Sequence, residues 1–342
     1  AMNALSLTIY WVGAAIVNRV SATDLAGRIS TFGDIVVFGT YATYIIMSLM
    51  MLVMILVLLP MAQVSAVRIN EVLDAPISLH EGKTTEAPEQ GTVEFRDVSF
   101  RYPSSSGDVL EHVSFRANKG ETIAFIGATG SGKTTLVSLA ARFYDATEGQ
   151  VLIDGQDVRS YSFDALYDRI GYVTQRAIVF AGDVRSNVLF GESGAPQDDE
   201  SVQRALSLAQ ATEFVDKLPG KLDAPIAQAG ANVSGGQKQR LSIARALARK
   251  PEILIFDDSF SALDYRTDAS LRAGLARELS DTTCLIVAQR IGTIRHADRI
   301  VVLDEGRVAG IGTHDELMKN CGVYREIAMS QLSAAELEKE GV

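Results

Sequence analysis

The feature that most restricts the fold of this chain is a stretch without any charged residue, from Ile35 to Val67. About 20 consecutive apolar residues are enough for a helix to cross a lipid bilayer, and this stretch is longer. Its centre, Ile45–Leu59, is apolar on every helical face, as lipid or a bundle interior requires. Few soluble domains could bury such a helix. We therefore predict a membrane helix over 33–74, kinked rather than ended at Pro60.

A second apolar stretch, residues 4–17, is shorter and allows two interpretations. It has the length of a signal-peptide core, but it lacks a basic region before it and a convincing cleavage site. We favour a membrane helix over about 4–18, the first half of a hairpin. The charged residues that follow would form the polar loop of this hairpin: Arg19, Asp24, Arg28 and Asp34. Residues 1–74 are thus predicted to be the C-terminal part of a transmembrane domain.

A polar segment, residues 75–91, is predicted to link this part to a second domain over 92–330, which a tail over 331–342 follows. Short β-branched runs alternate with helical patterns in the second domain and indicate an α/β fold with an inserted helical region. The predicted strands are Thr92–Tyr102, Val109–Ala117, Glu121–Ile126, Ile253–Phe256, Thr283–Val287 and Arg299–Leu303. The predicted helices are Lys133 to about Phe143 and most of 198–248.

Composition argues against several classes of function. The formal net charge of −10, with no stripe of lysine and arginine, argues against a nucleic-acid partner. The two cysteines, Cys284 and Cys321, have neither the number nor the spacing of a disulfide framework or a metal site, so we expect a reducing compartment. The four histidines are scattered and predict no metal site.

Residues 127–134 read Gly-Ala-Thr-Gly-Ser-Gly-Lys-Thr and fit the phosphate-binding pattern G-x-x-x-x-G-K-[ST]. The pattern lies between a predicted strand and a predicted helix, where backbone N–H groups can close around phosphates. Lys133 would reach the β- and γ-phosphates of ATP, and the Thr134 hydroxyl would bind Mg²⁺. The residues predicted to bind ATP in this loop are Gly127, Thr129, Gly130, Ser131, Gly132, Lys133, Thr134 and Thr135.

A predicted buried strand, Ile253–Phe256, is followed by two carboxylates, Asp257 and Asp258. It would deliver Asp257 to the edge of the phosphate site, where the carboxylate can hold the water shell of Mg²⁺. Many strands end in aspartate, so this pattern is specific only together with the loop at 127–134.

Between these two motifs lies the segment Val-Ser-Gly-Gly-Gln-Lys-Gln-Arg, residues 233–240. Ser234, Gly235 and Gly236 stand at the start of a predicted helix, Gln237–Arg249, and would form an anion site with an unobstructed backbone. The segment resembles the ABC signature, which together with the phosphate loop identifies the ABC ATPase family. By this resemblance, the four residues from serine to glutamine contact nucleotide that a partner subunit holds.

The resemblance implies further roles. Tyr102 stands where the family has an aromatic residue stacked on adenine. Gln175 resembles the glutamine that contacts Mg²⁺ and senses the membrane domain, and Asp264 lies in a segment like the loop that crosses to the partner. The implied Mg²⁺ ligands are Thr134, Gln175 and Asp257.

Residues 33–36 and 68–74 are similar to the last membrane helix of ABC exporters and its exit, so the resemblance covers nearly the whole chain. It implies six membrane helices in an exporter half, of which this sequence contains two. We therefore expect part of a half-transporter in the plasma or inner membrane, with its nucleotide-binding domain in the cytoplasm and a second half-transporter subunit as its partner.

Three positions depart from the family pattern. Asp258 stands where the family places a glutamate that polarises the attacking water, and its side chain is one methylene shorter. Gln289 replaces the switch histidine, and glutamine cannot take up a positive charge. Gln228 replaces a glutamate in a loop that contacts the membrane domain, which affects coupling rather than hydrolysis.

Two changes in one catalytic site predict a subunit that binds ATP but hydrolyses it slowly, through Lys133, Asp257, Asp258 and Gln289. Its intact signature would complete a competent site on a different partner subunit. Three alternatives stay open: a homodimer with weak activity at both sites, a soluble ABC ATPase of DNA repair or translation, and a regulatory ATP-binding subunit that does not transport.

Overall fold

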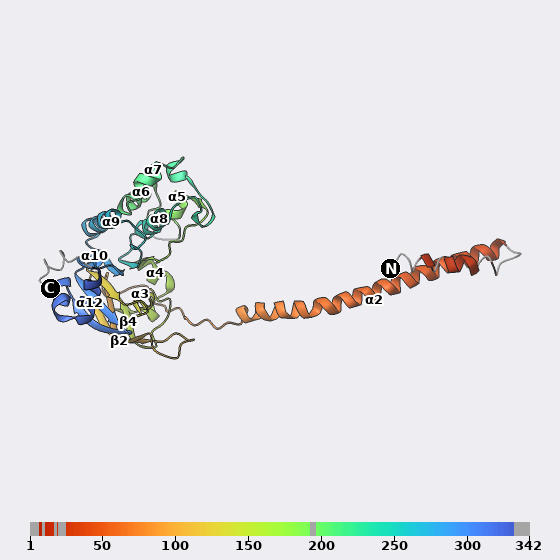
Figure 1. Cartoon of the computed structure of the whole chain (residues 1–342), viewed down its shortest axis with the longest axis horizontal. Helices are drawn as coiled ribbons and strands as arrows, with labels where there is room; N and C mark the ends of the chain where they lie inside the picture. The colour runs from red at the N-terminus through yellow and green to blue at the C-terminus, as the bar shows by residue number, and fades with distance from the viewer. Residues whose placement is uncertain (1–6, 9–10, 17–18, 20–24, 192–195, 332–342) are drawn as a thin grey trace. The chain divides into compact units, whose positions relative to one another are not determined.

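The structure of the chain is a computed structural model, which describes residues 7–8, 11–16, 19, 25–191 and 196–331. The chain divides into two compact units, Ala1–Ser78 and Leu79–Val342 (Figure 1).

The first unit is dominated by one helix, α2 (Leu25–Leu73), which continues through Pro60. From Gly33 onward it is long and apolar enough to cross a membrane, and it is the one such helix in the described residues. Its apolar side chains are exposed; Met51, for example, is 67% exposed. The Thr40 hydroxyl donates to the carbonyl four residues earlier, so its polar group is satisfied inside the helix, as lipid demands.

The N-terminal part of this unit differs in one respect from the prediction. Arg28 and Asp34 were expected in a loop, but α2 begins at Leu25 and both belong to it. Residues 11–16 are helical, and Gly13 lies so close to Ile35 of α2 that a Cβ atom on it would be 2.3 Å from Cγ2. The two helical segments therefore pack as a hairpin would, while much of the predicted helix over 4–18, and Asp24, lie outside the described residues.

The second unit contains two main sheets. The four-stranded antiparallel sheet has the order β2-β1-β4-β5. The six-stranded sheet has the order β12-β11-β3-β10-β9-β6, and only β12 runs antiparallel to its neighbour. The strands are β1 (Val93–Phe100), β2 (Leu110–Ala117), β3 (Thr122–Gly127), β4 (Glu148–Ile153), β5 (Gln156–Asp157), β6 (Ile170–Val173), β9 (Ile253–Asp257), β10 (Thr283–Val287), β11 (Arg299–Asp304) and β12 (Arg307–Gly312). A small pair, β7 (Gly182–Asp183) and β8 (Pro225–Ile226), lies apart.

Helices cover the six-stranded sheet and form the inserted region, which groups α5 to α8 in Figure 1. The α-helices of this unit are α3 (Lys133–Ala140), α4 (Phe163–Arg169), α5 (Val184–Val188), α6 (Asp199–Leu208), α7 (Thr212–Asp216), α8 (Gly235–Ala248), α9 (Tyr265–Glu278), α10 (Ile291–Ile294), α11 (His314–Asn320) and α12 (Gly322–Gln331). Short 3₁₀ turns are η1 (Val158–Ser160), η2 (Lys221–Asp223) and η3 (Gln228–Gly230). The predicted α/β fold with a helical insertion is confirmed.

The central strands are buried on both faces, which explains their continuous apolar sequences. Side chains alternate between two cores because successive residues of a strand point to opposite faces. In β3, for example, Ile123 and Phe125 face the core against the antiparallel sheet, whereas Ala124 and Ile126 face the core against the helices.

Several boundaries differ from the expected ones. The helix after the phosphate loop ends at Ala140 rather than near Phe143, and α8 begins at Gly235. The region 198–248 contains three helices, interrupted at 217–234 by two 3₁₀ turns and β8. The segment predicted as a linker is tied to the second unit, since the Gly82 N–H donates to the Tyr161 carbonyl over 2.9 Å. Both cysteines are free and buried.

Candidate functional site

Four of the predicted site segments follow four neighbouring strands. The strands β3, β10, β9 and β6 lie side by side and are parallel. The loop at 127–134, Gln289, the pair Asp257 and Asp258, and Gln175 come after them in that order. Because parallel strands end at the same edge of a sheet, these segments meet at one edge, where α/β folds bind ligands.

Glycines give the loop at 127–134 its shape. Gly130 and Gly132 have positive φ angles of 86° and 95°, which side chains rarely allow. A Cβ atom on Gly132 would also lie 2.6 Å from the Leu110 side chain, whereas nothing lies within 4 Å of one on Gly130. The backbone at Gly130 therefore borders open space, and Thr129 beside it is exposed. This cradle fits a phosphate group.

Lys133 is the first residue of α3 and points back into the loop. Its ammonium group donates to the carbonyls of Gly127 and Ala128 over 2.9 and 2.7 Å, and to the Ser131 hydroxyl over 3.2 Å. Burial lowers the pKa of Lys133, and the nearby carboxylates Asp258 and Asp257 oppose this effect. A buried ammonium held by weak neutral acceptors is suited to exchange them for phosphate oxygens.

Thr134, Asp257 and Tyr172 form one hydrogen-bonded group. The Thr134 hydroxyl donates to Asp257 Oδ1 over 2.9 Å, and the Tyr172 hydroxyl donates to Asp257 Oδ2 over 3.2 Å. Burial raises the pKa of the Asp257 carboxyl above its ordinary value and the charge of Asp258 adds to this rise, although the hydrogen bonds from Thr134 and Tyr172 and the charge of Lys133 oppose it. A hydroxyl and a carboxylate side by side are oxygen ligands of the type that Mg²⁺ prefers, so these residues fit the ion. The described residues contain no cluster of three or more His, Cys, Asp or Glu that would form a metal site independent of a nucleotide.

Asp258 is the centre of a second group. Its Oδ2 accepts from Gln175 Nε2 over 3.1 Å and from Gln289 Nε2 over 2.7 Å. Burial raises the pKa of Asp258, although the two amides, Lys133 and Arg290 oppose this shift. Two of the three departures from the family pattern, Asp258 and Gln289, therefore lie in direct contact, and Gln175 contacts Asp258 rather than Asp257.

Tyr102 contacts α3, the helix that follows the phosphate loop. Its hydroxyl is 3.0 Å from the Thr135 hydroxyl, and its ring packs edge-on against Phe100 and Tyr144, with centroids 4.8 and 5.1 Å away. Three aromatic rings thus form one cluster beside α3, in which Phe100 is buried while Tyr102 is half-buried and Tyr144 is exposed. The last two leave an apolar surface near the phosphate cradle.

The signature residues lie at the N-terminus of α8, within the inserted helical region, rather than in the cluster at the sheet edge. Ser234 caps the helix through a reciprocal pair of hydrogen bonds with Gln237: its N–H donates to Oε1 over 2.8 Å, and its Oγ accepts from the Gln237 N–H over 3.3 Å. Gly235 is exposed, and a Cβ atom on it would meet nothing within 4 Å, while one on Gly236 would lie 3.4 Å from the Ala262 carbonyl.

Two other predicted positions also make local contacts. Asp264 caps α9 by accepting from the Thr267 N–H over 3.0 Å and from the Thr267 hydroxyl over 2.7 Å. These bonds hold the pKa of Asp264 below its ordinary value. Gln228 is exposed at the start of η3.

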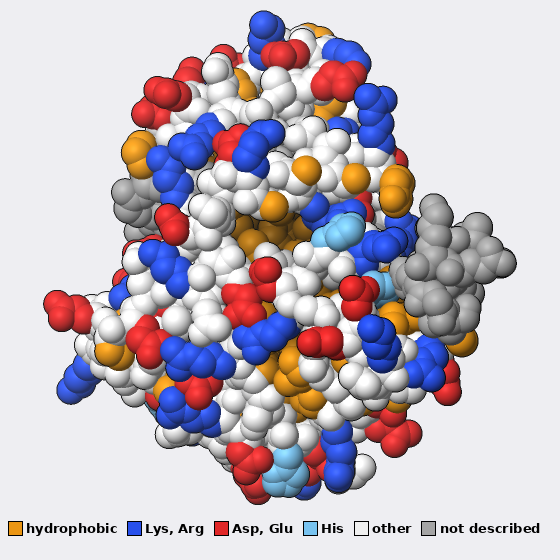
Figure 2. Space-filling view, turned by 90° about the vertical axis from the view of Figure 1, so that its left-hand side faces the viewer, with side chains coloured by type: hydrophobic (Ala, Val, Ile, Leu, Met, Phe, Trp, Pro, Cys, Tyr) orange, Lys and Arg blue, Asp and Glu red, His pale blue; other side chains and the backbone are white. Residues whose placement is uncertain are grey.

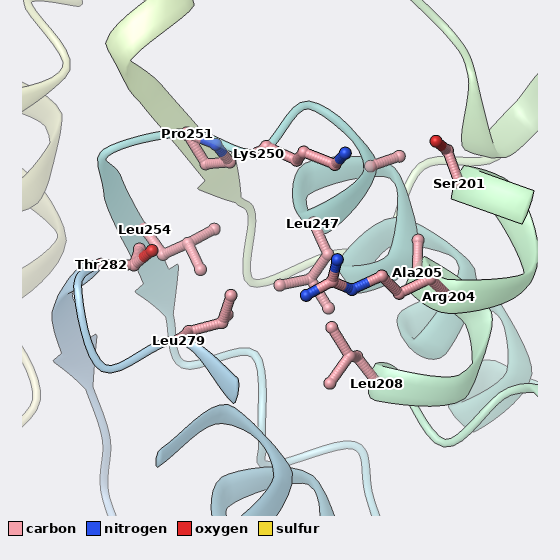
Figure 3. Close-up of a pocket in the computed structure, with 11 residues that line it drawn as sticks. Ser201, Arg204, Ala205, Leu208, Leu247, Lys250, Pro251, Leu254, Leu279 and Thr282 are labelled. Carbon is pink, nitrogen blue, oxygen red and sulfur yellow. The ribbon is translucent and has the colours of Figure 1, made fainter. Parts of the chain in front are cut away.

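Two cavities lie outside the phosphate loop. The smaller, about 200 Å³, lies where α6 and α8 meet the sheet, and Figure 3 shows Arg204 reaching toward Leu247 and Leu208 there. The larger, about 1190 Å³, lies between α9 and α10 and includes Gln289 in its wall. Figure 2 shows a hollow on the face that carries these helices, with hydrophobic side chains at its base and basic side chains at its edge.

The sequence analysis missed three residues that contact predicted site residues. Tyr172 begins the Tyr-Val-Thr-Gln segment, but only its glutamine was singled out. Tyr144 packs on Tyr102 from a loop with no recognisable motif. The Gln331 side chain donates a hydrogen bond to the Gln289 carbonyl, although Gln331 was assigned to the tail. Of these three residues, only Tyr172 could have been found from the sequence, since it stands beside Val173 at the end of a buried strand.

The fold and the loop between β3 and α3 define the chain as a P-loop nucleotide-binding protein. Residues 110–261 match the model of the ABC transporter family, and the chain belongs to this family. It is 40% identical over 340 residues to an uncharacterized ABC transporter ATP-binding protein of Mycobacterium tuberculosis. The matched region covers 98% of this chain and 56% of the relative.

Other relatives share this overlap. The chain is 39% identical to an ATP-dependent lipid A-core flippase of Xanthomonas oryzae, over 94% of this chain and 55% of the relative. The solved structure of a bacterial Atm1-family ABC exporter with ATP bound superposes with a TM-score of 0.73 at 31% identity, covering 97% of this chain and 57% of that one. The chain thus spans about half the length of the curated relatives that it matches.

Proposed function

We propose that this chain binds Mg-ATP in the cradle between β3 and α3. Gly130 and Gly132 present backbone N–H groups to the phosphates, and Lys133 exchanges its loop acceptors for phosphate oxygens. Thr134 and Asp257 hold Mg²⁺, whose charge offsets that of the β- and γ-phosphates. Tyr102 offers its ring to the adenine.

Hydrolysis at this site is slow in our proposal, and one observation carries this conclusion. The same oxygen of Asp258 accepts hydrogen bonds from both Gln175 and Gln289, and the amide at position 289 can neither take up a proton nor carry charge. A shortened carboxylate held by two amides is poorly placed to polarise a water. Loss of a well-placed general base typically costs on the order of 10²–10⁴-fold in rate.

The chain acts in our proposal as part of a half-transporter in the plasma or inner membrane, with the second unit in the cytoplasm. The family and the Atm1-type exporter fold support a dimer of two such halves. A partner with a complete site is favoured over a second copy because the signature at Ser234 to Gln237 is intact while the chain's own site departs at two positions.

Nucleotide binding tests the first part of this proposal. Titration calorimetry of the full chain in detergent with ATP and Mg²⁺ should show binding, and Lys133→Ala should abolish it because the buried positive charge is lost. Lys217→Ala is the matched control, since that lysine is exposed and pairs with Glu213 on α7. Unchanged ATP affinity of Lys133→Ala would contradict the proposed site.

Turnover tests the second part. The wild-type chain should hydrolyse ATP slowly, and the double substitution Asp258→Glu with Gln289→His should raise the steady-state rate by about 10²-fold or more. If the wild-type rate already equals that of an ABC subunit with glutamate and histidine at these positions, the slow site is refuted.

A further inference from the structure

The geometry points to Gln331, at the end of α12, as a positioning residue for the switch glutamine Gln289. The Gln331 side chain bonds the main chain on both sides of Arg290. Its Nε2 donates to the Gln289 carbonyl over 2.8 Å, and its Oε1 accepts from the Ile291 N–H over 2.9 Å. One amide group thus bridges the main chain of residues 289–291, called the switch segment below, in the way that a neighbouring strand would.

The bridge supplies a partner that the switch segment lacks locally. Arg290 is the N-cap residue of α10, and its side chain makes no capping hydrogen bond. The Ile291 N–H is one of the first N–H groups of that helix, which have no partner inside it. Gln331 Oε1 takes over the role of a cap, from an element 40 residues further along the chain.

The same bridge fixes the direction of the Gln289 side chain. With its carbonyl held by Gln331, the residue extends its own amide to Asp258 Oδ2 over 2.7 Å. A continuous hydrogen-bonded path therefore runs from α12 through Gln289 to the carboxylate beside the phosphate loop. Side chains held by such neighbouring bonds keep the orientation that a site needs.

The role of Gln331 is one of positioning rather than of holding α12 in place. Tyr324 and Ala328 bury the helix against the unit, whereas Gln331 itself is exposed and borders the cavity of about 1190 Å³. Its hydrogen bonds compete with water, so their loss changes the position of the switch segment more than the stability of the fold.

This inference rests on the proposed function, ATP binding by the full chain, and adds that Gln289 faces the γ-phosphate of that ATP. A glutamine amide in that place favours ATP over ADP by donating to the additional phosphate. Removing the bridge with Gln331→Met, which keeps the length of the side chain, should reduce the preference for ATP over ADP by about three- to tenfold. ADP affinity should not change.

A double-mutant cycle shows whether Gln331 acts through Gln289. Calorimetric affinities for Mg-ATP and Mg-ADP are compared for wild type, Gln331→Met, Gln289→Ala and the double variant. The double variant should lose no more ATP preference than Gln289→Ala alone, because the two residues share one path. Ser330→Ala is the matched control, since the Ser330 hydroxyl donates only to the Ile327 carbonyl of its own helix among the described contacts.

Hydrogen exchange gives a second readout that needs no nucleotide. In Gln331→Met the Ile291 amide should exchange about three- to tenfold faster than in wild type. Gln331→Glu keeps an oxygen for this N–H but loses the donor to the Gln289 carbonyl. It should therefore preserve the protection of Ile291 while still losing ATP preference.

Distinct results overturn distinct claims. A wild-type chain that binds no ATP refutes the proposed function, and the positioning role with it. If wild type binds ATP but Gln331→Met keeps its full preference for ATP, only the positioning role fails. It also fails if Gln289→Ala has no effect, if the two losses add in full, or if Ile291 exchange is unchanged.

Discussion

At the residue scale, Asp258 is the point where two parts of the site meet, because one of its oxygens accepts hydrogen bonds from both Gln175 and Gln289. The sequence identified Asp258 because it follows the predicted strand Ile253–Phe256, whereas Gln175 and Gln289 were singled out by their resemblance to family positions. It could not reveal that both glutamines bond the same oxygen of Asp258, since the three residues are separated by 83 and 31 positions and meet only through strand order. Pairing across a parallel sheet is a tertiary property.

Burial of Asp258 predicts a pH-dependent cost to stability. Its folded-state pKa is raised, so the protonated form is favoured in the fold and ionisation destabilises the fold as the pH rises through this raised pKa. Asp258→Asn removes the charge and keeps an oxygen for both amides. The nucleotide-free variant should therefore melt a few degrees above wild type at pH 7–8, and this gain should vanish as the pH falls through the raised pKa. Thermal unfolding between pH 4 and 8 measures both. A gain that grows toward low pH would show the opposite sign of linkage.

At the element scale, the sequence placed α3 and α8 well, but it missed where α3 ends and where α8 begins. Both helices were expected because a glycine-rich segment precedes an apolar pattern in each case. The end of α3 at Ala140 depends on the Ala141 and Arg142 backbone leaving the helix, with Arg142 at a positive φ of 50°. The irregular segment 217–234 is held by contacts such as the β7–β8 pair, which no local pattern signals. Local sequence thus indicates that a helix is present better than it indicates turns held by long-range contacts.

Two substitutions at the N-cap of α8 distinguish the effect of the cap on stability from the effect of a charge at the helix N-terminus. Ser234→Ala removes the side-chain oxygen that accepts from the Gln237 N–H, one half of the reciprocal pair, and should lower the free energy of unfolding by about 1 kcal/mol. Ser234→Asp keeps an N-cap oxygen and should restore that stability, while placing a negative charge where a phosphate would approach. Denaturant unfolding of the nucleotide-free chain measures the two variants. Equal destabilisation by both would mean that the serine packs rather than caps.

At the scale of the whole molecule, the α/β fold was predictable because its buried strands and phosphate loop leave strong signals. The antiparallel sheet was harder to anticipate, since β1 and β2 carry irregular registers and β4 was not predicted as a strand. The signature was recognisable, but its place away from the phosphate loop follows only from the fold. In one chain the phosphate loop and the signature thus lie on different elements, and in our proposal a second subunit brings such a pair together.

The division of labour between two subunits gives the last prediction. In a reconstituted two-subunit complex, Ser234→Ala or Gly235→Asp in this chain should cripple ATPase activity, because each alters the helix terminus that in our proposal faces the partner's nucleotide. Gly235→Asp is the sharper variant: its Cβ atom meets nothing within 4 Å, so the fold should tolerate it while the added charge repels phosphate. Asp258→Asn in the same chain should matter much less, since it affects the site that we propose to be slow. Equal losses would indicate that both sites carry turnover, as in a homodimer. A larger loss for Asp258→Asn would place the working site in this subunit.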